Sequence, residues 1–367
     1  RDDVESRGLG DVYKRQGRCI SLLKVMLTNY CIYDCAYCIN RRSNDLPRAT
    51  LSVSELVELT IEFYRRNYIE GLFLSSGVVR SPDYTMERLV RVAKDLRQVH
   101  RFNGYIHLKS IPGASRELVN EAGLYADRLS VNVEIPKEEN LKLLAPEKDH
   151  KSVFAPMKYI QQGVLESKEE RQKFRHAPRF APAGQSTQMI VGATSESDKD
   201  ILYLSSALYG RPTMKRVYYS GYVSVNTYDT RLPALKQPPL VRENRLYQAD
   251  WLLRFYQFKV DEIVDDAYPD LDLEIDPKLS WALRHPEQFP VDINKADYEM
   301  LLRVPGIGVK SAKLIVASRR FSRLGFYELK KIGVVMKKAQ YFITCKELPL
   351  QMLTVNELSP QRVRSLL

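Results

Sequence analysis

The sequence predicts an α/β fold followed by a small all-α C-terminal domain. Three observations lead to this prediction. Short β-branched apolar runs alternate with helical patterns from residue 20, an acidic and turn-rich stretch follows, and a basic helical region comes last. Strands that alternate with helices are parallel and joined by right-handed crossovers. The alternation therefore indicates either an open doubly wound sheet or a barrel-like sheet, and both collect ligands at the carboxyl ends of their strands.

Six apolar runs are expected to form the parallel strands, at residues 20–27, 71–75, 105–110, 129–135, 187–193 and 217–225. Helical periodicity is expected at residues 52–67, 85–99, 115–122 and 197–209. The first helix has a clear start signal, because Ser52 is followed three residues later by Glu55, the spacing of a capping box. The interval 136–186 is too long for a simple crossover, so it is either a lid or substrate-contacting insertion, or a mobile surface excursion.

Composition narrows the class of protein. With 367 residues, 44% of them hydrophobic and 28% charged, the chain can bury a core and is long enough for one large and one small domain. It contains no apolar run of the roughly 20 residues that cross a bilayer, so we expect no membrane span. The N-terminus also lacks a secretory signal, and the five cysteines are therefore expected to be thiols or metal ligands in a reducing cytoplasm.

Charge is concentrated in the basic region. Residues 295–346 contain 12 Lys and Arg against 3 Asp and Glu, a net charge of +9 out of +11 for the whole chain. Such a local excess indicates either a polyanion-binding surface or an ordinary solvated surface. The acidic stretch at 260–276 precedes it and is expected to mark a domain boundary.

The expected domain organisation follows from these changes in composition and charge along the chain. Residues 1–16 resemble translated sequencing-adapter read-through and are set apart as a non-native tail. The other boundaries place an α/β domain at 17–262 with its insertion at 136–186, a linker at 263–290 and a helical domain at 291–367.

Three of the five cysteines lie in one short loop after the first predicted strand. Cys31, Cys35 and Cys38 form the pattern C-x-x-x-C-x-x-C. Three thiolates on one loop can hold a soft metal centre, whereas a structural zinc site usually has four ligands in paired C-x-x-C groups. The spacing also differs from that of four-cysteine ferredoxin motifs. A 4Fe-4S cluster held by three cysteines would leave one iron open for a substrate or cofactor.

This spacing, directly after the first strand of a β-α repeat, resembles that of the radical S-adenosylmethionine (SAM) superfamily. The resemblance implies a partial (β/α)6 TIM-like barrel, a 4Fe-4S cluster on Cys31, Cys35 and Cys38, and SAM as second cofactor, cleaved to a 5'-deoxyadenosyl radical. It also implies that Tyr37 contacts the adenine of SAM. The remaining SAM contacts implied by matching motifs are Ser75, Ser76, Gly77, Asn132, Glu134, Ile190 and Gly192.

Longer stretches are similar to one subgroup, the bacterial DNA modification/repair radical SAM proteins. They are "LTNYCIYDCAYCINRRSND", "LFLSSGVVRSPDYTMERL", "GYIHLKSIPGAS" and "YEMLLRVPGIGVKSA". This resemblance implies action on DNA, an electron donor, and a partner related to uracil-DNA glycosylase. It does not supply a target base or sugar.

The basic region resembles a helix-hairpin-helix motif, which binds the DNA backbone without reading sequence. Asn294 is expected to cap the first helix, "PGIG" makes the turn, and a degenerate second copy follows around Gly333. Glycines in such a turn expose backbone amides to a phosphate. The expected DNA contacts are Pro305, Gly306, Ile307, Gly308, Lys310 and Lys313.

The leading interpretation is a radical SAM enzyme that modifies or repairs DNA. One alternative is an enzyme that modifies RNA or tRNA. Another is a redox-sensing DNA-binding protein, in which the cluster reports on oxidant or iron and SAM plays no part. SAM cleavage separates the last alternative from the other two.

Overall fold

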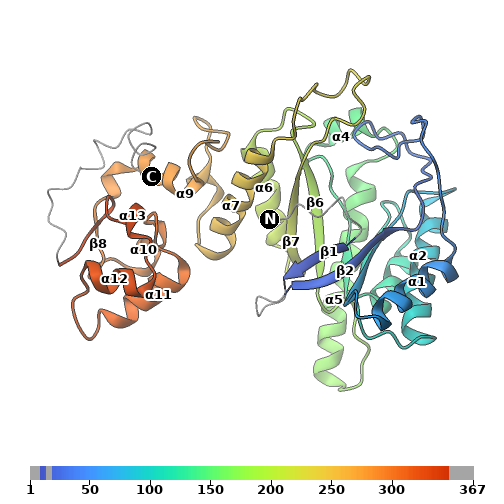
Figure 1. Cartoon of the computed structure of the whole chain (residues 1–367), viewed down its shortest axis with the longest axis horizontal. Coiled ribbons are helices and arrows are strands. Elements are labelled where there is room, and N and C mark those ends of the chain that lie inside the picture. The colour runs from blue at the N-terminus through green and yellow to red at the C-terminus, as the bar shows by residue number, and fades with distance from the viewer. Residues whose placement is uncertain (1–8, 14–18, 347–367) are drawn as a thin grey trace. The chain divides into compact units, whose positions relative to one another are not determined.

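The computed structural model describes residues 9–13 and 19–346 and divides the chain into two compact units (Figure 1). Unit 1 comprises Arg1–Ser195 and Ala207–Pro239, and unit 2 comprises Glu196–Ser206 and Leu240–Leu367. The division at 239/240 lies earlier in the chain than the expected end of the first domain at 262. Parts of the expected tail (1–16) and of the expected helical domain (347–367) lie outside the described residues.

Unit 1 is built on one seven-stranded sheet in which the strands are ordered as in the chain. The strands are β1 Leu9–Tyr13, β2 Cys19–Met26, β3 Gly71–Ser75, β4 Tyr105–Lys109, β5 Arg128–Ser130, β6 Gln185–Val191 and β7 Met214–Gly221. Strands β2 to β7 are parallel, and β1 pairs antiparallel with β2. A doubly wound sheet would reverse its strand order at a switch point. The order here has no reversal, so the sheet is the curled six-strand parallel half-barrel (Figure 1).

Helices connect these strands at or near the expected positions. They are α1 Val53–Arg65, α2 Pro82–Gln98, α3 Arg116–Tyr125, α4 Glu138–Leu144, α5 His150–Lys173 and α6 Asp198–Tyr209. The capping box predicted for α1 is confirmed: Ser52 Oγ accepts the Glu55 amide, and the Glu55 carboxylate accepts the Ser52 amide. Helix α2 starts three residues earlier than predicted, because Ser81 caps it and Pro82 occupies its first position.

The segment 136–186 forms the connection from β5 to β6. Helix α5 buries Val153, Met157 and Ile160, and it contacts both α3 and β6. The Phe180 ring after it fits against glycines: a Cβ on Gly123 would lie 2.1 Å from that ring. This apolar packing makes α5 a covering helix of the sheet. The short helix α4 before it contacts the cysteine loop, because the Ala36 amide donates to Leu144 O at 2.6 Å.

The two faces of the sheet differ in polarity. Alternate residues of the strands are fully buried and apolar, as expected for a face covered by helices; they include Leu72, Leu74, Ile106, Leu108, Leu129, Val191 and Val217. The residues between them are largely polar and partly exposed. The second face is therefore the one available to a ligand.

Unit 2 is mainly helical. Its elements are α7 Leu240–Phe255, α8 Val260–Ile263, α9 Pro277–Arg284, η1 Pro286–Gln288, β8 Val291–Asp292, α10 Tyr298–Arg303, α11 Val309–Ser318, α12 Phe326–Ile332, α13 Met336–Ala339 and β9 Ile343–Thr344. The pairing of β8 with β9 adds a two-stranded parallel sheet to the helices that the sequence predicted. None of the described helices is long and apolar enough to span a bilayer.

One predicted cap was wrong. Helix α10 begins at Tyr298, and its N-cap is Asp297, whose carboxylate accepts the Met300 amide. Asn294 instead makes a pair of hydrogen bonds with the backbone of Leu324, accepting its amide at 2.8 Å and donating to its carbonyl at 3.1 Å. Both residues fit an N-cap by type, and the position of the helix start decided between them.

Candidate functional site

The cysteine loop follows β2 at the carboxyl edge of the half-barrel. Cys35 is buried, whereas Cys31 and Cys38 are partly exposed, and all three are free thiols. Cys31 Sγ accepts the Val78 amide at 3.4 Å, and the Ile32 amide donates to Val78 O at 2.8 Å. The loop that follows β3 therefore supports the first cysteine of the motif.

The segment Ser75, Ser76, Gly77 ends β3 and brings its backbone against the cysteine loop. The Gly77 amide donates to Thr28 O at 2.8 Å, and a Cβ on Gly77 would lie 2.1 Å from Tyr30 O. Only glycine fits there. The Ser76 hydroxyl donates to Gly77 O at 2.7 Å, so this side chain serves the local turn.

A lysine that the sequence analysis missed lies among the predicted site residues. Lys148 Nζ lies 3.4 Å from the Tyr37 hydroxyl and 3.9 Å from Glu134 Oε1. Burial acts to lower the pKa of Lys148, but the neighbouring Tyr37, Cys35 and Glu134 outweigh it and raise that pKa above its ordinary value. Burial also raises the pKa of Tyr37. At neutral pH the Lys148 side chain is thus a charged ammonium.

Two of the three thiols, those of Cys35 and Cys38, are held in their protonated form. Burial raises the pKa of Cys35 to about 11, and it also raises the pKa of Cys38. The nearby Lys148 acts in the opposite direction on both groups. Since a thiolate is the ligand of a metal, binding at this loop must release protons, and an adjacent cation favours that release.

The other predicted SAM contacts lie around the same loop. Asn132 is buried and its amide donates to Gln188 Oε1 at 3.4 Å. The Ile190 amide donates to Glu134 O at 2.7 Å, and the Ile190 side chain packs in the same apolar cluster as Tyr37 and Cys38. Gly192 has a φ of +85°, a conformation that favours glycine. The structure therefore brings together residues that are about 160 positions apart in the sequence.

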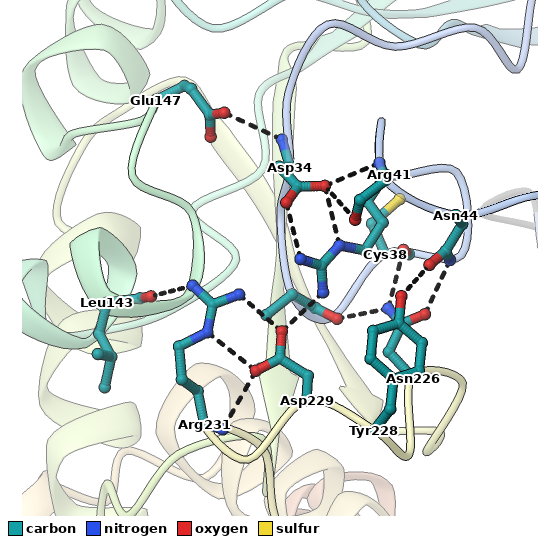
Figure 2. A network of polar contacts seen from close by, with 12 residues as sticks. Asp34, Cys38, Arg41, Asn44, Leu143, Glu147, Asn226, Tyr228, Asp229 and Arg231 are labelled. Carbon is teal, nitrogen blue, oxygen red and sulfur yellow. Dashed lines mark hydrogen bonds and ion pairs between the residues drawn. The ribbon is translucent and has the colours of Figure 1, made fainter.

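A network of charged groups fixes the second half of the cysteine loop (Figure 2). Arg41, which is buried, donates to both carboxylate oxygens of Asp34 at 2.9 and 2.7 Å and to Asp229 Oδ2 at 2.6 Å. Asp229 also accepts hydrogen bonds from the guanidinium of Arg231. The same guanidinium donates to Leu143 O at 3.0 Å. Hydrogen bonds from Arg41 hold the pKa of Asp34 well below its usual range, and those from Arg231 do the same for Asp229.

Asn226, in the segment after β7, completes this network. It is 1% exposed, and its side-chain amide donates to Ala36 O at 2.5 Å and to Cys38 O at 3.1 Å (Figure 2). Its side-chain oxygen accepts from Asn44 at 2.8 Å. One side chain from the last strand's loop therefore holds the backbone on both sides of Tyr37. Nothing local in the sequence marks this residue, because the contact spans 190 positions.

The donor set fits a cluster better than a single ion. Within the described ranges, no three His, Cys, Asp or Glu side chains are placed to ligate one metal ion. The cysteines of an iron-sulfur cubane each bind a different iron, so they need not converge on one point. Three thiols on one supported loop, with an ammonium beside them and no fourth cysteine in the motif, match that requirement.

The decisive comparison is with protein-family models. Residues 25–164 match the model described as the radical SAM superfamily. The match covers 140 of the 367 residues of the chain. It runs from the end of β2 through the middle of α5 and contains the cysteine loop, the Ser-Ser-Gly turn, Asn132, Glu134 and Lys148. Members of this superfamily are enzymes that use a 4Fe-4S cluster and SAM.

Three solved structures illustrate the likeness of the chain path. Methylornithine synthase (PylB) is 13% identical with a TM-score of 0.47, over 64% of this chain and 62% of that chain. SuiB of Streptococcus suis, bound to S-adenosylmethionine, is 10% identical with a TM-score of 0.42, over 64% and 44%. TsrM of Kitasatospora setae, with cobalamin and a [4Fe-4S] cluster bound, is 11% identical with a TM-score of 0.40, over 57% and 39%. This chain thus spans less than two thirds of each, and no curated relative matches it.

In unit 2 the two predicted hairpins are docked onto each other through their backbones. The Val335 amide donates to Gly306 O at 2.9 Å, and Ser311 Oγ donates to Gly333 O at 3.1 Å. Gly306 has a φ of +88°, and a Cβ there would lie 2.6 Å from Val335 O. Gly333, with a φ of +94°, ends α12 in the left-handed conformation. The second, degenerate copy is therefore a real structural partner of the first.

The backbone of the first hairpin also contacts two side chains that come from earlier in the chain. Lys278, which is buried in α9, donates from Nζ to Ile307 O at 2.6 Å. The Val309 amide donates to the hydroxyl of Tyr256. Burial lowers the pKa of Lys278 to about 7. These contacts use the Ile307 carbonyl and the Val309 amide, which are not the glycine amides that the sequence predicted to face a phosphate.

The predicted DNA contacts thus separate into two kinds. Pro305 and Ile307 are buried, whereas Lys310 and Lys313 are exposed on α11. Exposed cations continue beyond the hairpin at Arg320, Arg323, Lys330, Lys331 and Lys337. The geometry therefore assigns the apolar hairpin residues to packing and leaves the lysines facing solvent.

Proposed function

We propose that this protein is a radical SAM enzyme that acts on a nucleic acid, in DNA modification or repair, with its basic helical unit holding the DNA backbone. The observation that carries the first half is the family match over the segment that contains the three-cysteine loop. The second half is supported by the charge of the helical region, where 12 basic residues stand against 3 acidic ones between 295 and 346.

Cys31, Cys35 and Cys38 would hold the cluster, and the residues around them would hold SAM. A 4Fe-4S cluster bound there would supply the one electron that reductive cleavage of SAM requires. Lys148 is suited to an anionic group of the cofactor, because its ammonium stays charged and its pairing with Glu134 at 3.9 Å is loose. The Tyr37 ring beside it offers an apolar surface for a planar base.

Two features of unit 2 support binding to a nucleic acid backbone. Lysines and arginines are exposed along α11, the loop after it and α12, and a phosphate backbone recognises such a surface through charge alone. The docked hairpins hold that surface rigid. We therefore expect binding that depends strongly on salt and weakly on sequence.

The proposal is tested by assaying SAM cleavage with and without nucleic acid. Anaerobically reconstituted protein, reduced with dithionite, should form 5'-deoxyadenosine from SAM, and mass spectrometry of nucleosides from added DNA or RNA should show a new product. Cys35→Ala should abolish iron binding and 5'-deoxyadenosine formation while leaving salt-sensitive DNA binding intact.

Other outcomes would point elsewhere. A product from RNA alone would identify an RNA-modifying enzyme. DNA binding without any 5'-deoxyadenosine would favour a redox-sensing DNA-binding protein and overturn the enzyme proposal.

A further inference from the structure

The polar face of the half-barrel sheet carries two cross-strand rows of side chains that no part of the SAM site uses. Residues in a row are backbone partners on neighbouring strands, so their side chains point to the same side. The first row is Lys24, Phe73, His107 and Arg128. The second row is Lys109, Ser130, Ser186 and Arg216.

The rows are tied to each other and to the cysteine loop. His107 Nε2 lies 2.9 Å from Ser130 Oγ, which joins the first row to the second. Phe73 lies two positions before Ser75 on β3, so both are on this face, and the turn after Ser75 contacts the loop. A ligand on this face would therefore lie next to the cysteines.

Two cations on this face have no acidic partner among the described residues. Neither Arg128 nor Lys109 forms an ion pair or a side-chain hydrogen bond with any residue that the structure describes, although both are partly buried. The Arg128 Nε and the Ser186 Oγ are buried atoms that lack a hydrogen-bond partner. Buried polar atoms are normally satisfied, so these groups indicate a missing anionic or hydroxyl-rich ligand.

Aromatic rings lie between the cations. The Phe73 ring packs edge-on against the His107 imidazole, with ring centroids 4.4 Å apart, and Lys24 Nζ lies 5.7 Å from the Phe73 centroid. Burial lowers the pKa of His107 well below its usual range, and Arg128 and Lys109 add to this effect, so the imidazole is neutral at pH 7. A row of neutral rings between positive charges is suited to a planar base joined to a phosphate.

We propose that this polar face binds a nucleoside phosphate, with Arg128 and Lys109 contacting the phosphate and the Phe73–His107 pair contacting the base. The inference names the substrate class of the half-barrel and rests on the proposed function. A nucleotide within a nucleic acid and a free mononucleotide share this chemistry.

The test compares a nucleoside with its own phosphate. Binding of deoxyadenosine and of deoxyadenosine 5'-monophosphate to the full chain is measured by calorimetry, without cluster or SAM. The wild type should prefer the phosphate by about 10-fold or more, because charge-assisted hydrogen bonds to a phosphate are strong. Arg128→Gln and Lys109→Gln should each reduce that preference and leave nucleoside binding unchanged. Phe73→Leu should weaken both ligands by a similar factor.

Matched controls make the outcome specific. Lys158→Gln removes an exposed charge from the covering helix α5 and should change neither affinity. Competition by a short single-stranded oligonucleotide would identify a nucleic acid as the source of the phosphate, and its failure to compete would identify a free nucleotide. Equal binding of nucleoside and nucleoside phosphate by the wild type, or an unchanged preference in Arg128→Gln, would overturn the inference.

The outcome of this binding measurement can be told apart from the outcome of the SAM-cleavage assay. It requires neither SAM cleavage nor the basic helical unit, so loss of the proposed enzyme activity would leave its result standing. Conversely, a nucleic-acid product without any phosphate preference at this face would keep the proposed function and remove the inference.

Discussion

The cysteine loop and the paired hairpins are positioned by opposite uses of charge. In the loop, charged side chains are paired and largely withdrawn from solvent, with the buried Arg41 joining Asp34 and Asp229. In the hairpins, backbone groups make the defining contacts, and most of the lysines remain on the surface. Buried pairs fix one geometry, which a cluster site needs, whereas exposed charges remain available to a partner.

The largest expected effect follows from removing the centre of the buried network. Arg41→Met leaves the carboxylates of Asp34 and Asp229 without their shared partner, and breaking a buried pair of this kind costs about 3 kcal/mol. We expect a lower melting temperature and, because residues 34–41 lose their anchor, reduced iron content after reconstitution. Arg42→Met, which changes an exposed neighbour, is the control and should affect neither. Full iron loading by Arg41→Met would show that the network does not position the loop.

A second effect concerns Lys278 and has a definite sign. Its pKa is about 7 in the folded protein and about 10.4 in an unfolded chain, so between these values the unfolded state binds more protons. This group therefore makes the protein more stable as pH rises from about 7 to 10, by up to a few kcal/mol. Chemical denaturation at several pH values should show that Lys278→Met removes this rise. An identical pH slope in wild type and variant would mean that the ammonium is not desolvated.

The two hairpin glycines should differ in sensitivity. A side chain at Gly306 meets a φ of +88° and a contact of 2.6 Å, whereas a Cβ at Gly308 would have only the Tyr256 hydroxyl nearby, at 3.6 Å. Gly306→Ala should therefore destabilise the protein by about 1–2 kcal/mol, with a matched loss of DNA affinity near the melting temperature. Gly308→Ala, measured by the same thermal unfolding, should lie within about 0.5 kcal/mol of wild type. Equal losses in the two variants would argue against the docked geometry.

The contrast between the two regions also explains what the sequence could predict. The β-α order, the Ser52 capping box and the hairpin copies are local patterns, and each was found from residue type and spacing. The motif likewise marked Cys31, Cys35 and Cys38 without help from the fold. The choice of Asp297 over Asn294 as a cap needed the helix start, because both residues are good caps.

Contacts that depend on tertiary structure were not predictable in this way. Lys148 and Asn226 reach the cysteine loop from segments 111 and 188–190 positions away, and neither lies in a motif. The sequence also did not predict that the first hairpin would be contacted by Lys278, because Lys278 belongs to a helix outside the motif. Strand register, which aligns Arg128 with His107, likewise exists only in the folded sheet.

The smallest expected effect concerns the exposed lysines of the paired hairpins. Lys313 is exposed on α11 and forms no ion pair or side-chain hydrogen bond with the residues that the structure describes, so Lys313→Gln should leave the melting temperature unchanged. If it contacts one phosphate, the slope of log K against log salt should become shallower by about 0.9 for duplex DNA. Fluorescence anisotropy at several salt concentrations measures this slope. Lys158→Gln, on unit 1, should leave the slope as it is. An unchanged slope in Lys313→Gln would move the DNA surface away from α11 and toward the other exposed cations of the helical unit.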